Sequence, residues 1–376
     1  MKKNKLKVLT LVGTRPEIIK LSRVIPILDK HCDQVLVHSG QNYDYELNEI
    51  FFDDLKIRKP DHYLEVKSKS SSQAISKVIS KLDNLLLKIK PDAFLTLGDT
   101  NTSLGVIAAK KNKVPIFHME AGNRCFDMRV PEEVNRILVD HTSDINMPYS
   151  EIAREYLISE GIKKDHIVKT GSPMKEVIDF YSKNVNSSKL LKDLGLKKSK
   201  YFIVSSHREE NLDNYNNFKE FLNLLNALEK NYKLPVLVST HPRLQKKIEN
   251  QKSLLSDNII FNKPFGFSDY LSLMKNSKVV LSDSGTISEE ASILNLKAVN
   301  IRDTHERPEA SEMGVCIMTG MNVKNVMNAI DYFENSSNKI SHKIVKDYNE
   351  DNVSEVVLKT ILSYTDHVNK YSWRKT

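Results

Sequence analysis

The amino-acid sequence predicts an α/β protein in which each half of the chain forms a parallel β-sheet. Short apolar runs rich in β-branched residues alternate with longer stretches of helical periodicity, which is the pattern of right-handed βαβ units. The alternation occurs in both halves of the 376 residues, a length that suits about two domains. Polar segments directly follow the apolar runs, at the positions where open α/β sheets bind their ligands.

The N-terminal half begins with an apolar strand and then alternates. Strands are predicted at residues 6–12, 35–38, 93–97, 114–119 and 144–147. Residues 71–89 give the clearest helix, because their apolar residues recur at helical spacing. The other helices predicted in this half are residues 16–28, 43–55, 102–110, 131–139 and 151–160.

The C-terminal half repeats this organisation. Strands are predicted at residues 201–205, 236–239, 259–261, 279–281 and 298–301, and helices at residues 215–231, 242–251, 267–274, 285–294 and 323–333. A glycine, a proline and a polar stretch interrupt the pattern near residues 171–188. We therefore place the first domain at residues 1–170, completed by a C-terminal helix within 352–376, and the second domain at 171–351.

The composition is that of an ordinary globular protein, with 40% hydrophobic and 28% charged residues. No apolar run approaches the ~20 residues that span a bilayer, so no membrane segment is predicted. The basic residues 2–7 precede a first strand rather than a signal peptide, because no small-residue cleavage site follows them.

The charge and the cysteines limit the expected partners. The net charge of +8 favours anionic ligands. Lysine pairs such as Lys197-Lys198 have no interleaved aromatic residues, so nucleic acid is not a predicted partner. The 3 cysteines are far apart and form no CxxC motif, which supports neither a zinc site nor a disulfide framework and suits the reduced cytoplasm.

Polar segments at the ends of the predicted strands mark the expected site. They are residues 13–17, 98–100, 120–122, 206–210, 240–242 and 283–286. Ligands of open α/β sheets sit outside the carboxyl ends of the strands. Segments from both halves are therefore expected to converge on one cleft.

Residues 13–17 join the first strand to the first helix and suit an anion. Gly13 allows a tight turn, Pro16 suits the start of a helix, and the helix N-terminus offers free N–H groups. Arg15 adds a fixed positive charge, and Lys20 lies one turn further on. The segment matches neither GxGxxG nor a Walker motif, and a capped helix with surface Arg and Lys explains it equally well.

Loops of the N-terminal half also bring carboxylates to the sheet edge. Asp99 precedes a predicted helix, where an N-cap alone explains it. Glu120 follows its strand directly and precedes two small residues that leave open space. Glu132 lies in a first helical turn, where the helix dipole favours an acid. Each of these carboxylates alone is typical of a structural role, but three carboxylates at one sheet edge indicate acid/base chemistry.

The loops of the C-terminal half suit a phosphate group. His207 and His241 lie just beyond strands, and His207 precedes Arg208, which suits phosphate binding or proton transfer, although a lone histidine is usually packed or capping. No HxxxH or HxH spacing indicates a metal site.

The helix that begins near residue 285 suits a nucleotide. Ser284, Gly285 and Thr286 form a possible phosphate cradle at its N-terminus, and Glu290 is placed to accept hydrogen bonds from a ribose. Arg307 suits bidentate anion contact. An ordinary N-cap and a solvent-facing turn are the structural alternatives.

Taken together, these residues resemble the non-hydrolysing UDP-N-acetylglucosamine 2-epimerase family, through almost the whole chain. The matching motifs, in the family's order, are Gly13-Thr14-Arg15-Pro16-Glu17, Gly98-Asp99-Thr100, Glu120-Ala121-Gly122, Pro131-Glu132-Glu133, Asn135-Arg136, His207-Arg208, Asp283-Ser284-Gly285, Glu289-Glu290 and Glu306-Arg307-Pro308-Glu309.

The resemblance implies a fold, a reaction and an assembly. The fold is of the GT-B (glycogen phosphorylase-like) type, with two Rossmann-like domains facing a deep cleft that holds a UDP-sugar, and with a C-terminal helix returning to the first domain. The enzyme is an isomerase that needs no cofactor or metal. It expels UDP from C1 while removing the C2 proton, and UDP adds back to the resulting glycal after a proton reaches the other face. A homodimer is also implied.

The resemblance also assigns roles residue by residue. The expected acid/base carboxylates are Asp99, Glu120 and Glu132. The residues expected to act on the departing diphosphate are Arg15, Lys20 and His207, with Lys20 and His207 counted as catalytic. The residues expected to bind UDP in the second domain are His241, Ser284, Gly285, Thr286, Glu290 and Arg307.

Departures from the common family pattern favour one branch. They are Gly40-Gln41-Asn42-Tyr43-Asp44, Val130-Pro131-Glu132-Glu133, Asp140-His141-Thr142 and Gly171-Ser172-Pro173-Met174. They resemble the branch that makes UDP-N-acetyl-L-fucosamine from its L-talo epimer for capsule or O-antigen synthesis. Residues 40–44 also replace a segment linked to activation by substrate in some members, so such activation is not expected. The alternatives are a UDP-N-acetylglucosamine 2-epimerase giving UDP-N-acetylmannosamine, a GT-B glycosyltransferase and a non-enzymatic UDP-sugar sensor.

Overall fold

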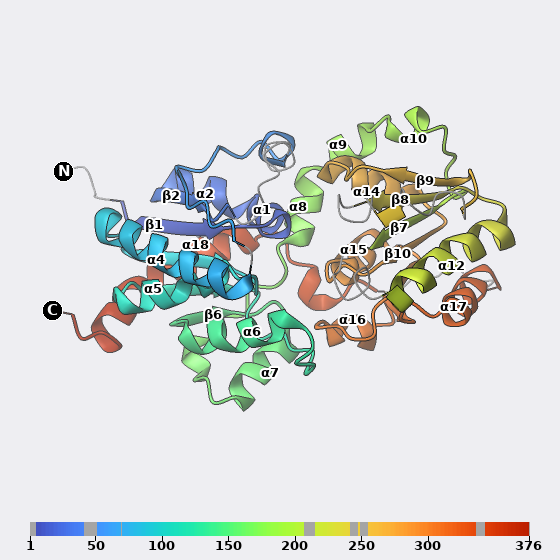
Figure 1. Ribbon diagram of the computed structural model, residues 1–376. Helices are drawn as coiled ribbons and strands as arrows, with labels where there is room; N and C mark the ends of the chain where they lie inside the picture. The colour runs from blue at the N-terminus through green and yellow to red at the C-terminus, as the bar shows by residue number, and fades with distance from the viewer. Residues whose placement is uncertain are drawn as a thin grey trace. The chain divides into compact units, whose positions relative to one another are not determined.

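The chain forms two compact units, each built around one six-stranded parallel sheet, as the sequence predicts (Figure 1). The computed structural model describes residues 5–40, 51–68, 70–206, 215–240, 247–248, 255–335 and 343–375. Unit 1 comprises Met1–Asp179 with Lys346–Thr376, and unit 2 comprises Phe180–Val345.

The sheet of unit 1 has the strand order β3-β2-β1-β4-β5-β6. Its strands are β1 (Lys7–Val12), β2 (Asp33–His38), β3 (His62–Tyr63), β4 (Ala93–Leu97), β5 (Ile116–Met119) and β6 (Ile145–Met147). Every residue of β4 and β5 is buried, because helices cover both faces of a parallel sheet. The strand order reverses between β1 and β4, which makes the carboxyl edge beside these strands the expected ligand site.

Helices enclose this sheet. They are α1 (Arg15–Leu21), α2 (Val24–His31), α4 (Ser71–Ile89), η1 (Ser103–Gly105), α5 (Val106–Lys111), α6 (Pro131–Thr142), α7 (Glu151–Ser159), η2 (Lys164–His166), α8 (Met174–Phe180), η4 (Lys346–Tyr348) and α18 (Val353–Tyr371). Helix α4 turns Val78, Leu82 and Leu86 onto the core that includes Leu11 and Phe94. The C-terminal helix α18 packs against α2 of unit 1, as predicted (Figure 1).

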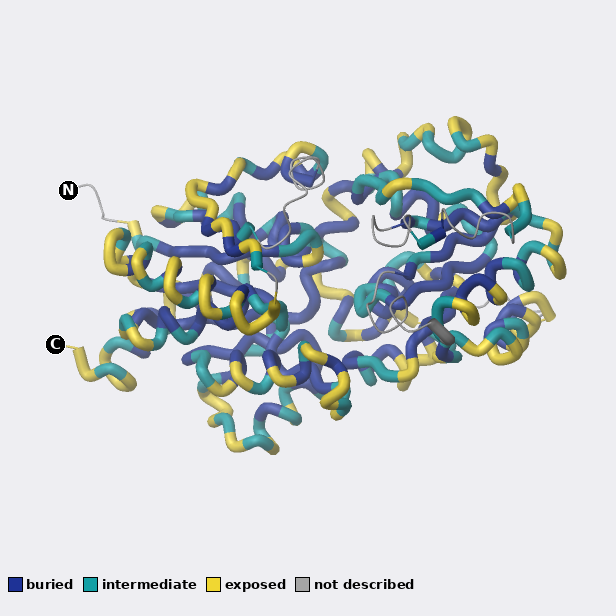
Figure 2. Tube along the Cα trace, viewed as in Figure 1, coloured by how far each residue is buried: buried dark blue, intermediate teal, exposed yellow. Residues whose placement is uncertain are grey.

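The sheet of unit 2 has the order β12-β11-β10-β7-β8-β9. Its strands are β7 (Phe202–Ser206), β8 (Val236–Thr240), β9 (Ile259–Asn262), β10 (Val279–Ser282), β11 (Ala298–Asn300) and β12 (Cys316–Met318). Its helices are α9 (Ser182–Ser187), α10 (Leu190–Asp193), α12 (Tyr215–Tyr232), α14 (Phe267–Asn276), α15 (Ile287–Leu294), α16 (Pro308–Glu312) and α17 (Val323–Asn335). Figure 2 shows buried strands inside each unit and helices with exposed outer faces.

Some elements differ from the sequence prediction. The single helix expected over residues 16–28 is two helices, α1 and α2, separated at Ser22 and Arg23. Pro26 explains the break, because it has no N–H to bond to the carbonyl four residues earlier but is tolerated in the first turn of α2. The sequence prediction did not include the edge strands β3 and β12, which are two and three residues long.

The stretch near residues 171–188, where the sequence pattern is interrupted, is largely helical, since α8 and α9 lie within it. The predicted helix 242–251 lies almost entirely outside the described residues, as does most of the predicted helix 43–55. These two predictions stay open.

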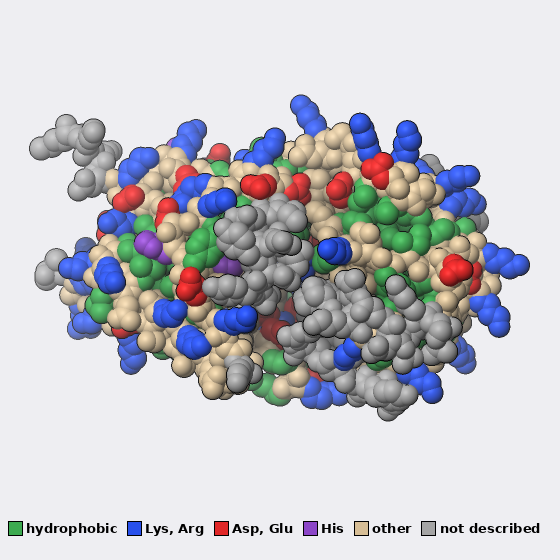
Figure 3. Space-filling model, turned by 45° about the horizontal axis from the view of Figure 1, so that its top comes forward, with side chains coloured by type: hydrophobic (Ala, Val, Ile, Leu, Met, Phe, Trp, Pro, Cys, Tyr) green, Lys and Arg blue, Asp and Glu red, His purple; other side chains and the backbone are tan. Residues whose placement is uncertain are grey.

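The visible surface carries charge of both signs. Figure 3 shows Lys and Arg side chains dispersed over this face together with Asp and Glu, rather than gathered into one basic patch. Within the described residues, every helix is too short or too polar to cross a bilayer.

Candidate active site

Neighbouring strands of unit 1 deliver the predicted residues to one edge. Strand β4 pairs with β1 on one side and with β5 on the other, all in parallel. The backbone N–H of Gly98 donates to the carbonyl of Met119 at 3.0 Å, so the loops after β4 and β5 begin level with each other. Asp99 and Glu120, the residues that follow, therefore leave adjacent strands at the same edge.

Glu120 pairs with Lys20 of α1. Its Oε2 lies 2.5 Å from the Nζ of Lys20, and the two side chains are 12% and 2% exposed. The amine of Lys20 also lies 5.4 Å from the ring centre of Tyr149. The backbone of Glu120 is left-handed, with φ of 65°, which is uncommon for a residue with a side chain and recurs at functional sites.

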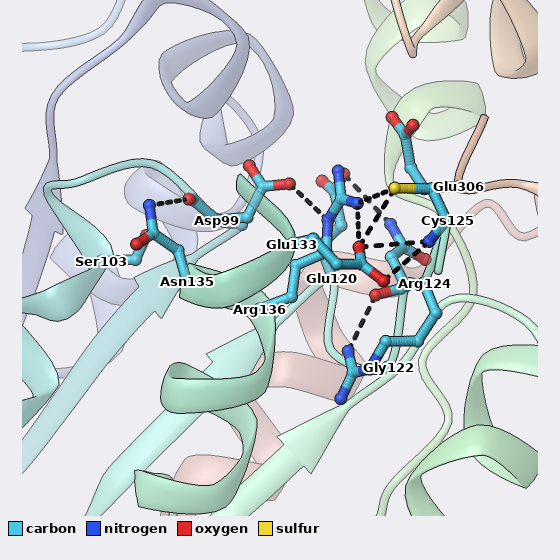
Figure 4. A network of polar contacts seen from close by, with 12 residues as sticks. Asp99, Ser103, Glu120, Gly122, Arg124, Cys125, Glu133, Asn135, Arg136 and Glu306 are labelled. Carbon is cyan, nitrogen blue, oxygen red and sulfur yellow. Dashed lines mark hydrogen bonds and ion pairs between the residues drawn. The ribbon is translucent and has the colours of Figure 1, made fainter. Parts of the chain in front are cut away.

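Asp99 pairs with Arg136 of α6. The guanidinium Nε of Arg136 donates to Oδ2 of Asp99 at 2.8 Å, and the amide of Asn135 donates to the Asp99 carbonyl, also at 2.8 Å (Figure 4). Thr102, and not Asp99, occupies the N-cap position of η1, the helical segment that follows. Asp99 is therefore not the N-cap that its sequence position allowed, and its carboxylate is held by a cation at the sheet edge.

The two acids at the start of α6 have different surroundings. Glu133 accepts hydrogen bonds from the backbone N–H groups of Cys125 and Phe126 at 3.1 and 2.8 Å, and from Arg136 at 2.6 Å. Burial alone would raise the pKa of Glu133, but these donors hold it below its usual range. Glu133 thus fixes the loop that follows Glu120, whereas the half-buried Glu132 is the predicted acid/base residue of this turn.

Glu17 is a buried carboxyl that the sequence prediction left without a role. Its Oε2 accepts hydrogen bonds from the backbone N–H groups of Gly13 and Thr14 at 2.6 and 3.3 Å, and its Oε1 accepts one from the Thr100 hydroxyl at 2.8 Å. Burial raises the pKa of Glu17 to about 7, and these donors oppose the rise only in part. Glu17 therefore ties the loop after β1 to the loop after β4.

This buried carboxyl predicts a pH-dependent stability difference between the native protein and the Glu17→Gln variant. The pKa of Glu17 is about 7 in the folded state, against 4.5 in the unfolded chain. The protonated carboxyl therefore makes its full contribution to the free energy of unfolding below pH 4.5, and this contribution is lost as the pH rises through 7. The native protein is expected to lose about 3 kcal/mol relative to Glu17→Gln across this range. Urea unfolding of both proteins at pH 4.5 and 8 measures it, and a constant difference would contradict the prediction.

Arg15 begins α1 on the same edge. It is half-buried, and its guanidinium carbon lies 5.4 Å from the ring centre of Phe51. Stacking of this kind helps to orient a guanidinium. This position suits the predicted contact with a diphosphate.

In unit 2, the predicted phosphate cradle follows β10. The N–H of Ser284 donates to the Ser282 hydroxyl at 3.0 Å, and the hydroxyls of Ser284 and Thr286 lie 2.9 Å apart. Thr286 is the N-cap of α15. The cradle therefore lies at a helix N-terminus, where the free N–H groups and the helix dipole favour an anion.

A buried ion-pair cluster packs against this cradle. Arg307 donates from Nη1 to Glu306 at 2.9 Å, and its Nε lies 3.3 Å from Glu289. Glu306 also accepts a hydrogen bond from Arg302 at 3.0 Å. Gly285 lies so close that a Cβ there would meet Oε1 of Glu306 at 2.3 Å and Nη1 of Arg307 at 2.8 Å.

Gly285→Ala is therefore expected to disturb this cluster. The added methyl group must displace Glu306 or Arg307, and overpacking of this kind costs about 1–3 kcal/mol. Urea denaturation should show a lower free energy of unfolding than for Ser284→Ala, which removes a half-buried hydroxyl and adds no atoms. Equal stability of the two variants would be evidence against the close packing.

Glu290, the predicted ribose contact, lies in the first turn of α15. Its side chain is nearly buried. Burial, together with the nearby Glu290 carboxylate, raises the pKa of both Tyr270 and Cys316, in the case of Cys316 to about 12. The Tyr270 hydroxyl thus stays protonated at neutral pH.

Part of the predicted site cannot be placed. His207 and His241 lie outside the described residues, so their roles stay predictions. No cluster of three or more His, Cys, Asp or Glu side chains in the described part of the chain is arranged to hold a metal ion.

Comparison with known proteins gives consistent matches over the whole chain. A family model described as UDP-N-acetylglucosamine 2-epimerase matches residues 28–362. The solved structure of a UDP-N-acetylglucosamine 2-epimerase from Rickettsia bellii is 49% identical, covers 99% of this chain and 100% of its own, and superposes with a TM-score of 0.93.

Two further matches carry information about ligands. The UDP-GlcNAc 2-epimerase of Methanocaldococcus jannaschii, solved in complex with UDP-GlcNAc and UDP, is 31% identical, covers 96% of this chain and 100% of its own, and gives a TM-score of 0.88. The UDP-2,3-diacetamido-2,3-dideoxy-D-glucuronate 2-epimerase of Pseudomonas aeruginosa is 35% identical over 84% of this chain and 88% of its own length. Similar proteins thus bear names with different sugars.

Proposed function

This chain belongs to the UDP-N-acetylglucosamine 2-epimerase family and is a UDP-sugar 2-epimerase, and on that premise we propose that its substrate is a UDP-2-acetamido-2,6-dideoxy-L-hexose. The proposed reaction interconverts the L-talo and L-fuco epimers at C2. It uses elimination and re-addition of UDP.

The placement of Asp99 and Glu120 carries the proposed mechanism. They leave adjacent parallel strands, and each is paired with a buried cation, Arg136 or Lys20. One carboxylate removes the C2 proton while the C1–O bond breaks and its electron pair leaves with UDP, which gives the glycal. A proton then reaches the opposite face of C2 as a phosphate oxygen re-forms the bond to C1, so atoms and charge balance.

Other predicted residues are proposed to bind the diphosphate and the ribose of the substrate. Arg15 and Lys20 are proposed to neutralise charge on the departing diphosphate, where electrostatic stabilisation contributes most to such reactions. In unit 2, Ser284 and Gly285 at the start of α15 are proposed to hold a phosphate, and Glu290 the ribose.

The choice of sugar rests on sequence segments. Residues 130–133 and 171–174 resemble the branch acting on 6-deoxy-L-sugars. The names of the similar proteins show that identity of about 35% does not fix the sugar. UDP-N-acetylglucosamine is the second candidate, because the 49% identical protein from Rickettsia bellii carries that name.

Hydrogen exchange at C2 is the test. The purified protein is incubated in heavy water with either UDP-2-acetamido-2,6-dideoxy-L-talose or UDP-N-acetylglucosamine, and NMR follows deuterium at C2 and the epimeric product. We expect turnover of the 6-deoxy-L-sugar without an acceptor. Turnover of UDP-N-acetylglucosamine alone would reject the proposed sugar, and UDP release only in the presence of an acceptor would indicate a glycosyltransferase.

A further inference from the structure

His118 lies two residues before Glu120 in the chain, and the proposed mechanism gives it no function. It is on the buried strand β5 and is 1% exposed. Its Nε2 lies 3.0 Å from the carbonyl of Gly98, the residue before Asp99. Its Nδ1 lies 2.9 Å from Oδ1 of Asp140 on α6. One side chain thus connects the ends of β4 and β5 to the helix that faces them.

Both neighbours of the imidazole ring are acceptors. A carbonyl oxygen and a carboxylate oxygen accept hydrogen bonds and donate none, whereas a neutral histidine has only one N–H. The Nδ1–Oδ1 contact with Asp140 is within ion-pair distance, but neither atom makes a hydrogen bond of good geometry. Burial alone would raise the pKa of Asp140, but His118 and Arg124 hold it below its usual range, so the partner is a carboxylate.

Asp140, the neighbour of His118, also contacts the loop that follows Glu120. Its Oδ2 accepts a hydrogen bond from the backbone N–H of Gly122 at 3.1 Å and another from Arg124 at 2.7 Å. Arg124 in turn donates to the carbonyl of Asn123 at 2.8 Å and to Glu160, the residue after α7, at 2.6 Å. The loop that holds Glu120 is therefore fixed on both sides of that residue.

Close packing leaves this loop little room to adjust. Gly122 has φ of 81°, and a Cβ there would meet the Ala153 carbonyl at 2.3 Å. Glu120 itself is held in the left-handed region, with its N–H bonded to Met147 at 3.1 Å. Such a backbone persists only when surrounding contacts over-determine it.

We propose that the His118–Asp140 pair is a positioning pair, which sets the separation of Asp99 and Glu120 by fixing Gly98 on one side and Gly122 on the other. This inference rests on the acid/base roles proposed for Asp99 and Glu120. A misplacement of about 1 Å between reacting groups commonly costs about 10²-fold in rate. Loss of the pair should therefore lower kcat far more than it changes KM.

Single variants separate the two contacts of the ring. His118→Ala removes both. In His118→Gln, the side-chain amide N–H takes the position of Nε2 and reaches the Gly98 carbonyl. In His118→Asn, the amide N–H takes the position of Nδ1 and reaches Asp140. His141→Ala is the matched control. His141 follows Asp140 on α6 and is 44% exposed, and Glu160 is the one residue of this network that it contacts.

The test measures kcat, KM and urea unfolding for each variant on the UDP-sugar that the native enzyme turns over. We expect His118→Ala to lower kcat by about 10²-fold with KM within about threefold, Gln or Asn to recover at least part of the loss, and His141→Ala to match the native enzyme. A kcat within threefold of native for folded His118→Ala overturns the inference, as does failure of all three His118 variants to fold. An inactive native enzyme would instead reject the proposed function, and with it the pair's task.

Discussion

Glu120→Gln is expected to slow hydrogen exchange at C2 by about 10²–10⁴-fold, the usual contribution of a general acid or base. The amide keeps the shape of the side chain but cannot take or deliver the proton. It also removes the carboxylate charge that lies 2.5 Å from the nearly buried ammonium of Lys20. Exchange measured by NMR in heavy water, together with UDP binding by calorimetry, separates lost chemistry from lost binding.

Glu155→Gln is the matched control for this experiment. Glu155 is an exposed residue of α7, and its replacement makes the same chemical change away from the sheet edge. It should leave the exchange rate unchanged. Retention of near-native exchange by Glu120→Gln would show that the acid/base pair lies elsewhere.

Arg15→Ala is expected to slow cleavage of the C1–O bond by about 10²–10³-fold, because it removes a preorganised positive charge from the departing diphosphate. The guanidinium is already oriented by Phe51, at 5.4 Å from the ring centre, so little reorganisation is needed when charge develops. UDP should also bind more weakly. Rapid-quench measurement of glycal and UDP formation reports the cleavage step directly.

Lys88→Ala removes an equally charged but exposed side chain from α4 and should have no effect. A loss confined to KM in Arg15→Ala, with kcat retained, would mean that Arg15 binds the ground state and the transition state equally.

The alternation of apolar runs and amphipathic stretches was sufficient to predict both sheets and most of the helices that cover them. Strands β4 and β5 are continuous apolar runs, and α4 repeats its apolar residues at helical spacing, so local sequence and final burial agree. The helical spacing of residues 16–28 predicts a single helix, and Pro26 is the one local signal in that segment for its division into α1 and α2.

The candidate site residues are predicted by their position after strands and not by hydrophobic periodicity. Asp99 and Glu120 follow buried strands directly, which identifies the edge they reach but not their partners. Arg136 stood in a recognised motif without a role, and only the packing of α6 places its guanidinium on Asp99. Glu17 also stood in a recognised motif without a role. His118 gave no signal, because a histidine within an apolar strand is common in structural positions.

The sequence by itself determined where strands and helices form and which loops reach the carboxyl edges, because hydrophobic periodicity and turn residues act over a few neighbouring positions. Only the tertiary structure decided the charge pairs: Lys20 with Glu120, Arg136 with Asp99, and His118 with Asp140. Each of the first two joins residues far apart in the chain, and the third joins a strand to a helix. A pair of this kind forms only when the packing of separate elements brings its two groups together, which no local pattern encodes.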